Sequence, residues 1–530
     1  MTETTAVSAW APLRVTAFRS LWLALLASNI GTWMQLVGAQ WLLIDEPNAS
    51  TLVAVVQTSL MLPALLLSLP AGAVADSFDR RQLLIVVQGY LVLVGVALAG
   101  LTAADQMPPA LLLTLTFGLG VGQALTMPAW QALVPDLVPR NTLPAASALG
   151  GISVNAARAV GPAVAGLLIA HVGVEAVFGF NALSYLIFAV VLAVWRPDRG
   201  RDRGTPERFT SALRAGDRYA RHSPVMRRLL LRSALFLVPG TALWALLPLI
   251  ADRRLGMGSS GYGLLLAALG IGAIGGALVL SRVRARWRGN PLLMAASVGY
   301  GVCLAVVGLV RNPVLVTLAL LPAGAIWTAV LSSLNAEMQM FLPAWVRARG
   351  MAIYMVVFAG GQAVGALMWG GVADLTDLPA THLVAAGLMV VGGLTVRGWP
   401  LRDVRGISRE PAVYWQEPDL VVEPESQDGP ILVSAKYLVL PDKQDEFVTA
   451  MQAVRRSRMR TGATRWGLYR SGEEPDTFVE VYLVPTWDVH LRQHYGRLTE
   501  ADRTSEEHAH SLTEGDPQVT HLLPTDPDPG

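Results

Sequence analysis

Apolar blocks of roughly 20 residues repeat between Phe18 and Trp399, separated by short polar joints. A helix rises about 1.5 Å per residue, so about 20 apolar residues cross the hydrocarbon core of a bilayer. The composition agrees, because 53% hydrophobic and only 15% charged residues make a chain of 530 residues too apolar for an ordinary soluble protein. The sequence therefore predicts an all-α polytopic membrane protein.

The apolar blocks give twelve candidate spans of the length that a membrane helix needs. They lie near residues 18–43, 51–74, 82–103, 110–133, 143–170, 175–195, 229–251, 260–281, 291–310, 313–340, 348–373 and 380–400. The segment before the first block lacks the basic start and cleavage site of a signal peptide, so we expect that block to stay as a membrane helix.

Arginines gather in alternate joints, whereas the other joints hold only Arg253, Arg254 and Arg311, beside several acids. Cytoplasmic joints of membrane proteins collect Lys and Arg. The sequence therefore predicts that both termini and the long joint at 196–228 face the cytoplasm.

The long joint divides the spans into two sets of six, an arrangement expected of two halves related by a pseudo-twofold axis along the membrane normal. Part of it, residues 211–228, can form an amphipathic helix at the membrane surface. The predicted organisation is an N-terminal half at 1–195, a central loop at 196–228, a C-terminal half at 229–400, a linker at 401–429 and a soluble module at 430–524.

The joint after the second span resembles the loop signature of the major facilitator superfamily, Gly-x-x-x-Asp-Arg-x-Gly-Arg-Arg/Lys. Gly72, Asp76, Arg80 and Arg81 match it, while Ser77 and Asp79 depart from it. The resemblance implies that the four matching residues form a latch between helices that changes with conformation.

The fifth span holds a second match, because Gly161, Pro162 and Gly166 resemble the Gly-Pro element of antiporters in that superfamily. Small residues let helices approach closely, and proline bends the backbone where two halves seal. With Pro128–Pro135, the region is similar to the transmembrane secretion effector branch, which includes bacterial siderophore exporters. This resemblance implies a twelve-helix exporter in a bacterial inner membrane.

Two charged residues of the apolar blocks, Arg158 and Glu337, stand out, because a charge inside a span is costly and is by default a hypothesis of function. Arg158 lies near the middle of its span, and Glu337 near the end of another. Either one is a candidate for proton coupling. The alternatives are that Arg158 pins helices together and that Glu337 sits at the cytoplasmic mouth.

Amides and an aromatic ring inside the spans suit an amphipathic organic substrate. An aromatic ring stacks against many different ligands, and a few hydrogen bonds from amides fix the orientation of the ligand. Hydrogen bonding between helices is the alternative for each amide. The candidates for a substrate cavity are Asn29, Trp33, Gln35, Gln57, Gln123, Asn335 and Gln362.

The chain has no Gly-x-x-x-x-Gly-Lys-Ser/Thr phosphate loop, and its first lysine is Lys436. The energy for transport must then come from an ion gradient or from the substrate's own gradient. We expect membrane lipid, a small-molecule substrate and protons as partners. We expect no resident cofactor or metal, no catalytic residue and no nucleic-acid partner.

The soluble module at 430–524 alternates between strand and helix patterns in the order β-α-β-β-α-β, which predicts a ferredoxin-like α+β domain. It resembles the antibiotic biosynthesis monooxygenase-like domains, which commonly dimerise, so a homodimer through this module is a further expectation. Trp487, His490 and His494 share one helical face. They suit a metal or haem site, or else simple packing.

The sequence thus predicts a proton-coupled secondary transporter that exports a small lipophilic or siderophore-like compound by alternating access. A second hypothesis makes the C-terminal module the active part, as an enzyme or sensor for a small aromatic metabolite. A third is a receptor that binds without transport.

Overall fold

The structure is a computed structural model that describes residues 10–195, 209–286, 289–343, 345–401, 420, 422 and 424–525, with side chains omitted at 68–77, 140, 144, 209–215, 281, 285 and 348. The chain divides into two compact units. The first contains Met1–Pro206, Leu230–Asn335 and Tyr354–Pro400, and the second contains Glu207–Leu229, Ala336–Ile353 and Leu401–Gly530.

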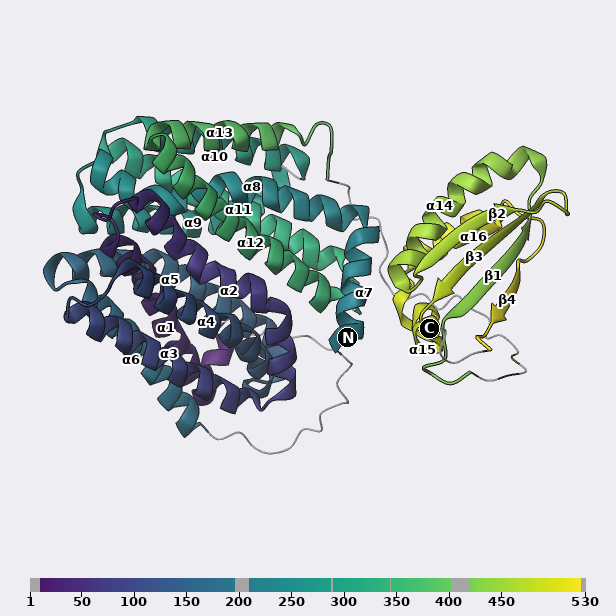
Figure 1. Ribbon diagram of the computed structural model, residues 1–530, viewed down its shortest axis with the longest axis horizontal. Helices are drawn as coiled ribbons and strands as arrows, with labels where there is room; N and C mark the ends of the chain where they lie inside the picture. The colour runs from purple at the N-terminus through teal and green to yellow at the C-terminus, as the bar shows by residue number, and fades with distance from the viewer. Residues whose placement is uncertain are drawn as a thin grey trace. The chain divides into compact units, whose positions relative to one another are not determined.

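Long apolar helices build the first unit, and the twelve helices at the predicted spans fall into two sets of six (Figure 1). The N-terminal set is α1 (Thr16–Leu42), α2 (Ala49–Ser77), α3 (Arg80–Ala103), α4 (Pro109–Leu137), α5 (Leu143–His171) and α6 (Val174–Val194). The C-terminal set is α8 (Pro224–Leu249), α9 (Gly258–Arg286), α10 (Asn290–Leu309), α11 (Pro313–Phe341), α12 (Arg347–Leu375) and α13 (Leu378–Leu394).

Eleven helices in the described part of the chain are long and apolar enough to cross a membrane. The twelfth predicted span corresponds to α13, an apolar helix of 17 residues. Large apolar side chains such as Leu278, Leu93 and Val194 remain exposed on the helices, as expected where lipid replaces water. The prediction of a polytopic helical fold is confirmed.

The predicted central loop contains α7 (Phe209–His222), which confirms a helix in this segment. The predicted start of the seventh span was wrong by five residues, because α8 begins at Pro224 rather than at 229. The cause is local: the Ser223 hydroxyl accepts a hydrogen bond from the Met226 N–H at 3.3 Å, and proline suits the first helical position.

The C-terminal module has the predicted ferredoxin-like order. Its four strands pair antiparallel in the order β2-β3-β1-β4, and helices α14 and α16 pack on one face of the sheet (Figure 1). The elements are β1 (Ile431–Leu438), α14 (Gln444–Thr461), β2 (Arg465–Arg470), β3 (Thr477–Val484), α15 (Trp487–Arg492), a π-turn (Gln493–Arg497), α16 (Glu500–His510) and β4 (Gln518–Leu522).

One helix of this module was not predicted. The predicted order has a single helix between the third and fourth strands, whereas α16 follows α15 as a further helix before β4. Its start is marked by a capping box, in which the Thr499 hydroxyl and backbone N–H both bond to Asp502. That Thr-x-x-Asp signal is present in the sequence.

Candidate functional site

Hydrogen bonds join the two halves of the first unit on the side where the joints carry few arginines. Tyr262 donates to the Gln40 side chain at 2.5 Å, and Arg253 donates to the Ile44 carbonyl at 3.1 Å. On the same side, the Thr51 backbone N–H donates to Asp374 at 3.1 Å. The contacts hold this side of the bundle closed.

Arg158 lies midway along α5, and its guanidinium carbon is 5.4 Å from the centre of the Trp33 ring on α1. Within the described part of the chain, it has no hydrogen-bond or ion-pair partner. A cation against an aromatic face in a desolvated site gains about 2 kcal/mol, which is small beside the cost of burying an unpaired charge. Arg158 therefore suits an anionic or strongly accepting ligand group.

Another arginine inside a predicted span, Arg232, illustrates a structural role. Arg232 on α8 is 3% exposed and donates to the Gly392 carbonyl at 3.0 Å and to the Thr395 hydroxyl at 2.7 Å. It thereby satisfies the carbonyl end of α13. Sequence reasoning overlooked Arg232, although it falls inside a predicted span.

Aromatic rings continue from Trp33 into the C-terminal half. The ring centres of Trp33 and Trp244 are 6.0 Å apart, and those of Trp244 and Trp327 are 5.6 Å apart. Tyr300 and Phe236 extend the series from Trp327, at 5.9 and 5.7 Å. The cation and this row of rings together span the junction of the halves. Sequence reasoning identified Trp33 but missed the others.

Two glycines of the predicted sealing element explain why the helices come so close. A Cβ atom at Gly161 would lie 2.7 Å from the Cβ of Trp33, so only glycine lets α5 and α1 bring Arg158 against that ring. A Cβ atom at Gly166 would lie 3.0 Å from the Cα of Gly263, where α5 crosses α9. Pro162 lies on the same face, since its carbonyl oxygen would be 2.7 Å from a Cβ at Gly263.

Five of the predicted cavity amides form hydrogen bonds between helices. Gln57 donates to Gln362 at 3.3 Å between α2 and α12, and both are buried. The other three bond within the N-terminal half: Asn29 to Ser153 at 2.9 Å, Gln123 to Thr32 at 3.3 Å, and Gln35 to Asn181 at 3.4 Å. The observed contacts match the alternative of interhelical bonding.

Asn335 and Glu337 lie in the last two turns of α11, and both side chains are partly buried. Glu337 is one turn from the end of the helix at Phe341. This position agrees with the alternative that it sits at a mouth of the bundle. Its proton-coupling role stays a prediction.

Comparison with known families decides the identity of the chain. The sequence model described as "transmembrane secretion effector" matches residues 7–527. The chain belongs to this family of major facilitator transporters.

Two curated relatives of this transporter are siderophore carriers by name. The staphyloferrin A transporter of Staphylococcus aureus is 27% identical over 258 residues, which cover 48% of this chain and 64% of that protein, less than two thirds of its length. The enterobactin exporter EntS of Shigella boydii is 28% identical over 333 residues, covering 61% of this chain and 77% of that protein.

Solved structures show the same fold at low identity. The nucleoside transporter NupG has a TM-score of 0.56 and 14% identity, covering 72% of this chain and 98% of its own. A D-xylose–proton symporter has a TM-score of 0.58 and 13% identity, covering 72% and 97%. A bacterial homologue of the lysosomal transporter Spinster has a TM-score of 0.53 and 16% identity, covering 73% and 95%.

The latch residues of this secretion effector bond within the N-terminal half. Arg80 donates to the Ala132 carbonyl at 2.9 Å and to Asp136 at 3.1 Å, both on α4. Arg81 donates to the Leu192 carbonyl at 2.8 Å, at the end of α6. Gly72 and Asp76 belong to α2, and their side-chain positions lie outside the described part. Sequence reasoning missed Asp136 as a partner.

The C-terminal module of the transporter brings Trp487, His490 and His494 together, as predicted. The ring centre of His490 lies 5.1 Å from that of Trp487 and 4.8 Å from that of His494. His490 Nε2 lies 3.1 Å from His521 Nε2. Burial, with the nearby His521 and Arg458, lowers the pKa of His490 to about 3, so its imidazole is neutral at physiological pH. Among the described residues, no group of three such side chains has the arrangement of a metal site.

Proposed function

We propose that this transporter exports a small amphipathic, siderophore-like compound in exchange for protons, by alternating access. The observation that carries the proposal is the Arg158 guanidinium on the Trp33 ring, continued by Trp244 and Trp327 from the other half. A ligand held there touches both halves, so their relative movement changes its access. The names of the two siderophore transporters among its relatives support the substrate class.

The arrangement of the halves supports an inward-open state. The hydrogen bonds from Tyr262 to Gln40 and from Thr51 to Asp374 close the arginine-poor side. The distribution of arginines assigns that side to the exterior and both termini to the cytoplasm. The close crossing at Gly166 and Gly263 provides a contact about which the halves can rock.

We assign proton coupling to Glu337. It is an acid within an apolar helix, and a change in its surroundings between the two states of the cycle would let it bind and release a proton as access alternates. Arg158 then holds the substrate, rather than carrying the proton. Organic substrates with an acceptor or anionic group beside an aromatic ring fit that role.

The test is substrate flux in proteoliposomes, driven by a pH gradient and screened over catecholate and carboxylate siderophores and lipophilic antibiotics. The Glu337→Gln variant should lose proton-driven flux and keep substrate exchange without a gradient. Asp105→Asn is the matched control, because Asp105 is exposed in a joint and Asn tolerates its positive φ. Absence of flux for the wild type with every compound, or full proton-driven flux in Glu337→Gln, would contradict the proposal.

A further inference from the structure

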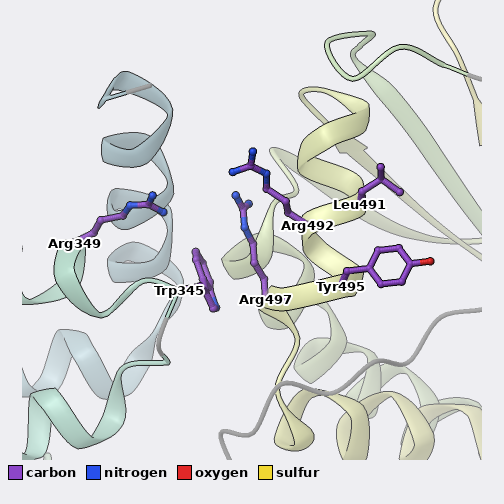
Figure 2. A pocket seen from close by; sticks show the side chains of 7 residues that line it. Trp345, Arg349, Leu491, Arg492, Tyr495 and Arg497 are labelled. Atoms are coloured by element: carbon purple, nitrogen blue, oxygen red, sulfur yellow. The ribbon is translucent and has the colours of Figure 1, made fainter. Parts of the chain in front are cut away.

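A pocket of about 380 Å³ lies in the second unit, between the C-terminal module and the start of α12. Trp345 and Arg349 form one wall, and Leu491, Arg492, Tyr495, Gly496 and Arg497 form the other. In Figure 2 the side chains of Arg492 and Arg497 lie next to each other, and the Trp345 ring is drawn between them and Arg349. Neither the transport site nor the latch uses these residues.

The lining is strongly cationic, because it contains three arginines and no acid. Asp488 pairs with Arg492 at 3.0 Å and compensates one charge. Arg497 donates to the Thr461 carbonyl at 2.8 Å and holds its guanidinium carbon 5.1 Å from the centre of the Trp345 ring. These contacts fix the orientation of Arg497.

The pocket lies beside the contacts that attach the module to α7 and to the segment between α11 and α12. Arg218 on α7 donates to the Gly462 carbonyl at 3.2 Å, and Arg460 on α14 lies over the ring of Tyr219 at 5.6 Å. Tyr219 in turn contacts Trp345, with ring centres 5.8 Å apart. A ligand in the pocket therefore touches both sides of an attachment that already exists.

We propose that this pocket binds a multiply charged phosphate anion, which fastens the C-terminal module to the start of α12. Planar guanidinium groups bond phosphate oxygens in pairs, and three of them from two chain segments suit a ligand with several such oxygens. The phosphate is either a soluble metabolite or the headgroup of a lipid, since both present the same oxygens.

Titration calorimetry of the full-length protein in phosphatidylcholine nanodiscs, with inorganic pyrophosphate as the probe, tests the site. We expect one site per chain. We also expect Arg349→Gln and Arg497→Gln each to weaken binding roughly tenfold or more, as loss of a charge-assisted hydrogen bond does. Arg470→Gln is the matched control, because Arg470 is an exposed arginine of the same module. Melting temperatures show whether each variant is folded.

Nanodiscs of phosphatidylglycerol distinguish the two sources. A lipid occupant competes with pyrophosphate, so the wild type would bind the probe more weakly in phosphatidylglycerol, while a soluble occupant leaves its affinity the same in both lipids. Either result supports the site when the two arginine variants weaken binding and the control does not. The proposal is overturned if folded wild-type protein binds no pyrophosphate at millimolar concentration in phosphatidylcholine, or if Arg470→Gln weakens binding as much as Arg349→Gln.

Discussion

The guanidinium carbon of Arg158 lies 5.4 Å from the centre of the Trp33 ring, which joins the middle of α5 to α1. No other described residue pairs with this arginine. By contrast, Arg232 is 3% exposed and donates its hydrogen bonds to the carbonyl end of α13. The difference supports our proposal that Arg158 binds a ligand rather than holding the helices together.

Replacing Arg158 by Gln should raise the KM for export roughly tenfold or more. A cation held near an aromatic ring and an acceptor group of the substrate contributes about 2 kcal/mol to substrate binding. Arg158→Lys should recover part of the lost affinity, since lysine keeps the positive charge but lacks the planar guanidinium group. Flux against substrate concentration in proteoliposomes measures both. Arg311→Gln, at an exposed arginine in a joint, is the control and should match the wild type. An unchanged KM in Arg158→Gln would show that the arginine is structural.

The sequence predicted the helices and the two halves because both depend on local composition and on the length of a bilayer span, and it made Arg158 a candidate for the same reason. It did not predict Trp244 and Trp327 as partners of Trp33, since those rings come from the other half and meet only in the folded bundle. Gln57 and Gln362 illustrate the same limit. Each was a reasonable cavity residue alone, and together they form one hydrogen bond.

Adding a methyl group at Gly166 should disturb the contact between the halves. A Cβ there would lie 2.7 Å from the Ser259 carbonyl oxygen and 3.0 Å from the Cα of Gly263, and backbone atoms yield little. We expect Gly166→Ala to lower both the melting temperature and the export rate. Gly179→Ala is the control, because a Cβ at Gly179 meets nothing within 4 Å, and alanine stabilises a helix by about 1 kcal/mol relative to glycine. Equal melting temperatures for the two variants would contradict this explanation of the sealing element.

The ion pair between Arg80 and Asp136 should be weak. Its charged atoms are 3.1 Å apart, but the side chains are 34% and 38% exposed, and pairs of this kind contribute about 0–1 kcal/mol. A double-mutant cycle with Arg80→Ala and Asp136→Ala, read from thermal unfolding, should give a coupling energy below about 1 kcal/mol. Arg80→Ala alone should cost more than Asp136→Ala, because it also removes the bond to the Ala132 carbonyl. A coupling of several kcal/mol would instead identify this pair as a strong latch.

Glu506 in the C-terminal module should make its stability depend on pH. Burial raises the pKa of this carboxyl to about 7, against the lowering effect of Arg458, which lies 2.8 Å away, while the neighbouring Glu480 raises it further. The carboxyl of an unfolded chain has a pKa of about 4.3. Between these values the folded state binds more protons, so the stability from this group is complete below pH 4.3 or so and is lost as the pH rises through about 7.

Comparison of the wild type with Glu506→Gln isolates this effect from the buried histidines, which titrate in the opposite sense because their pKa values are lowered. The free energy of opening of α14 and α16, from hydrogen exchange corrected for the intrinsic pH dependence of amides, measures it in the full-length protein. The opening free energy of the wild type minus that of the variant should decrease between about pH 4.5 and pH 7 and then level off. Glu507→Gln, at the exposed neighbour, should show no such trend, and a flat difference for Glu506→Gln would mean that Glu506 is ionised in the folded module throughout this range.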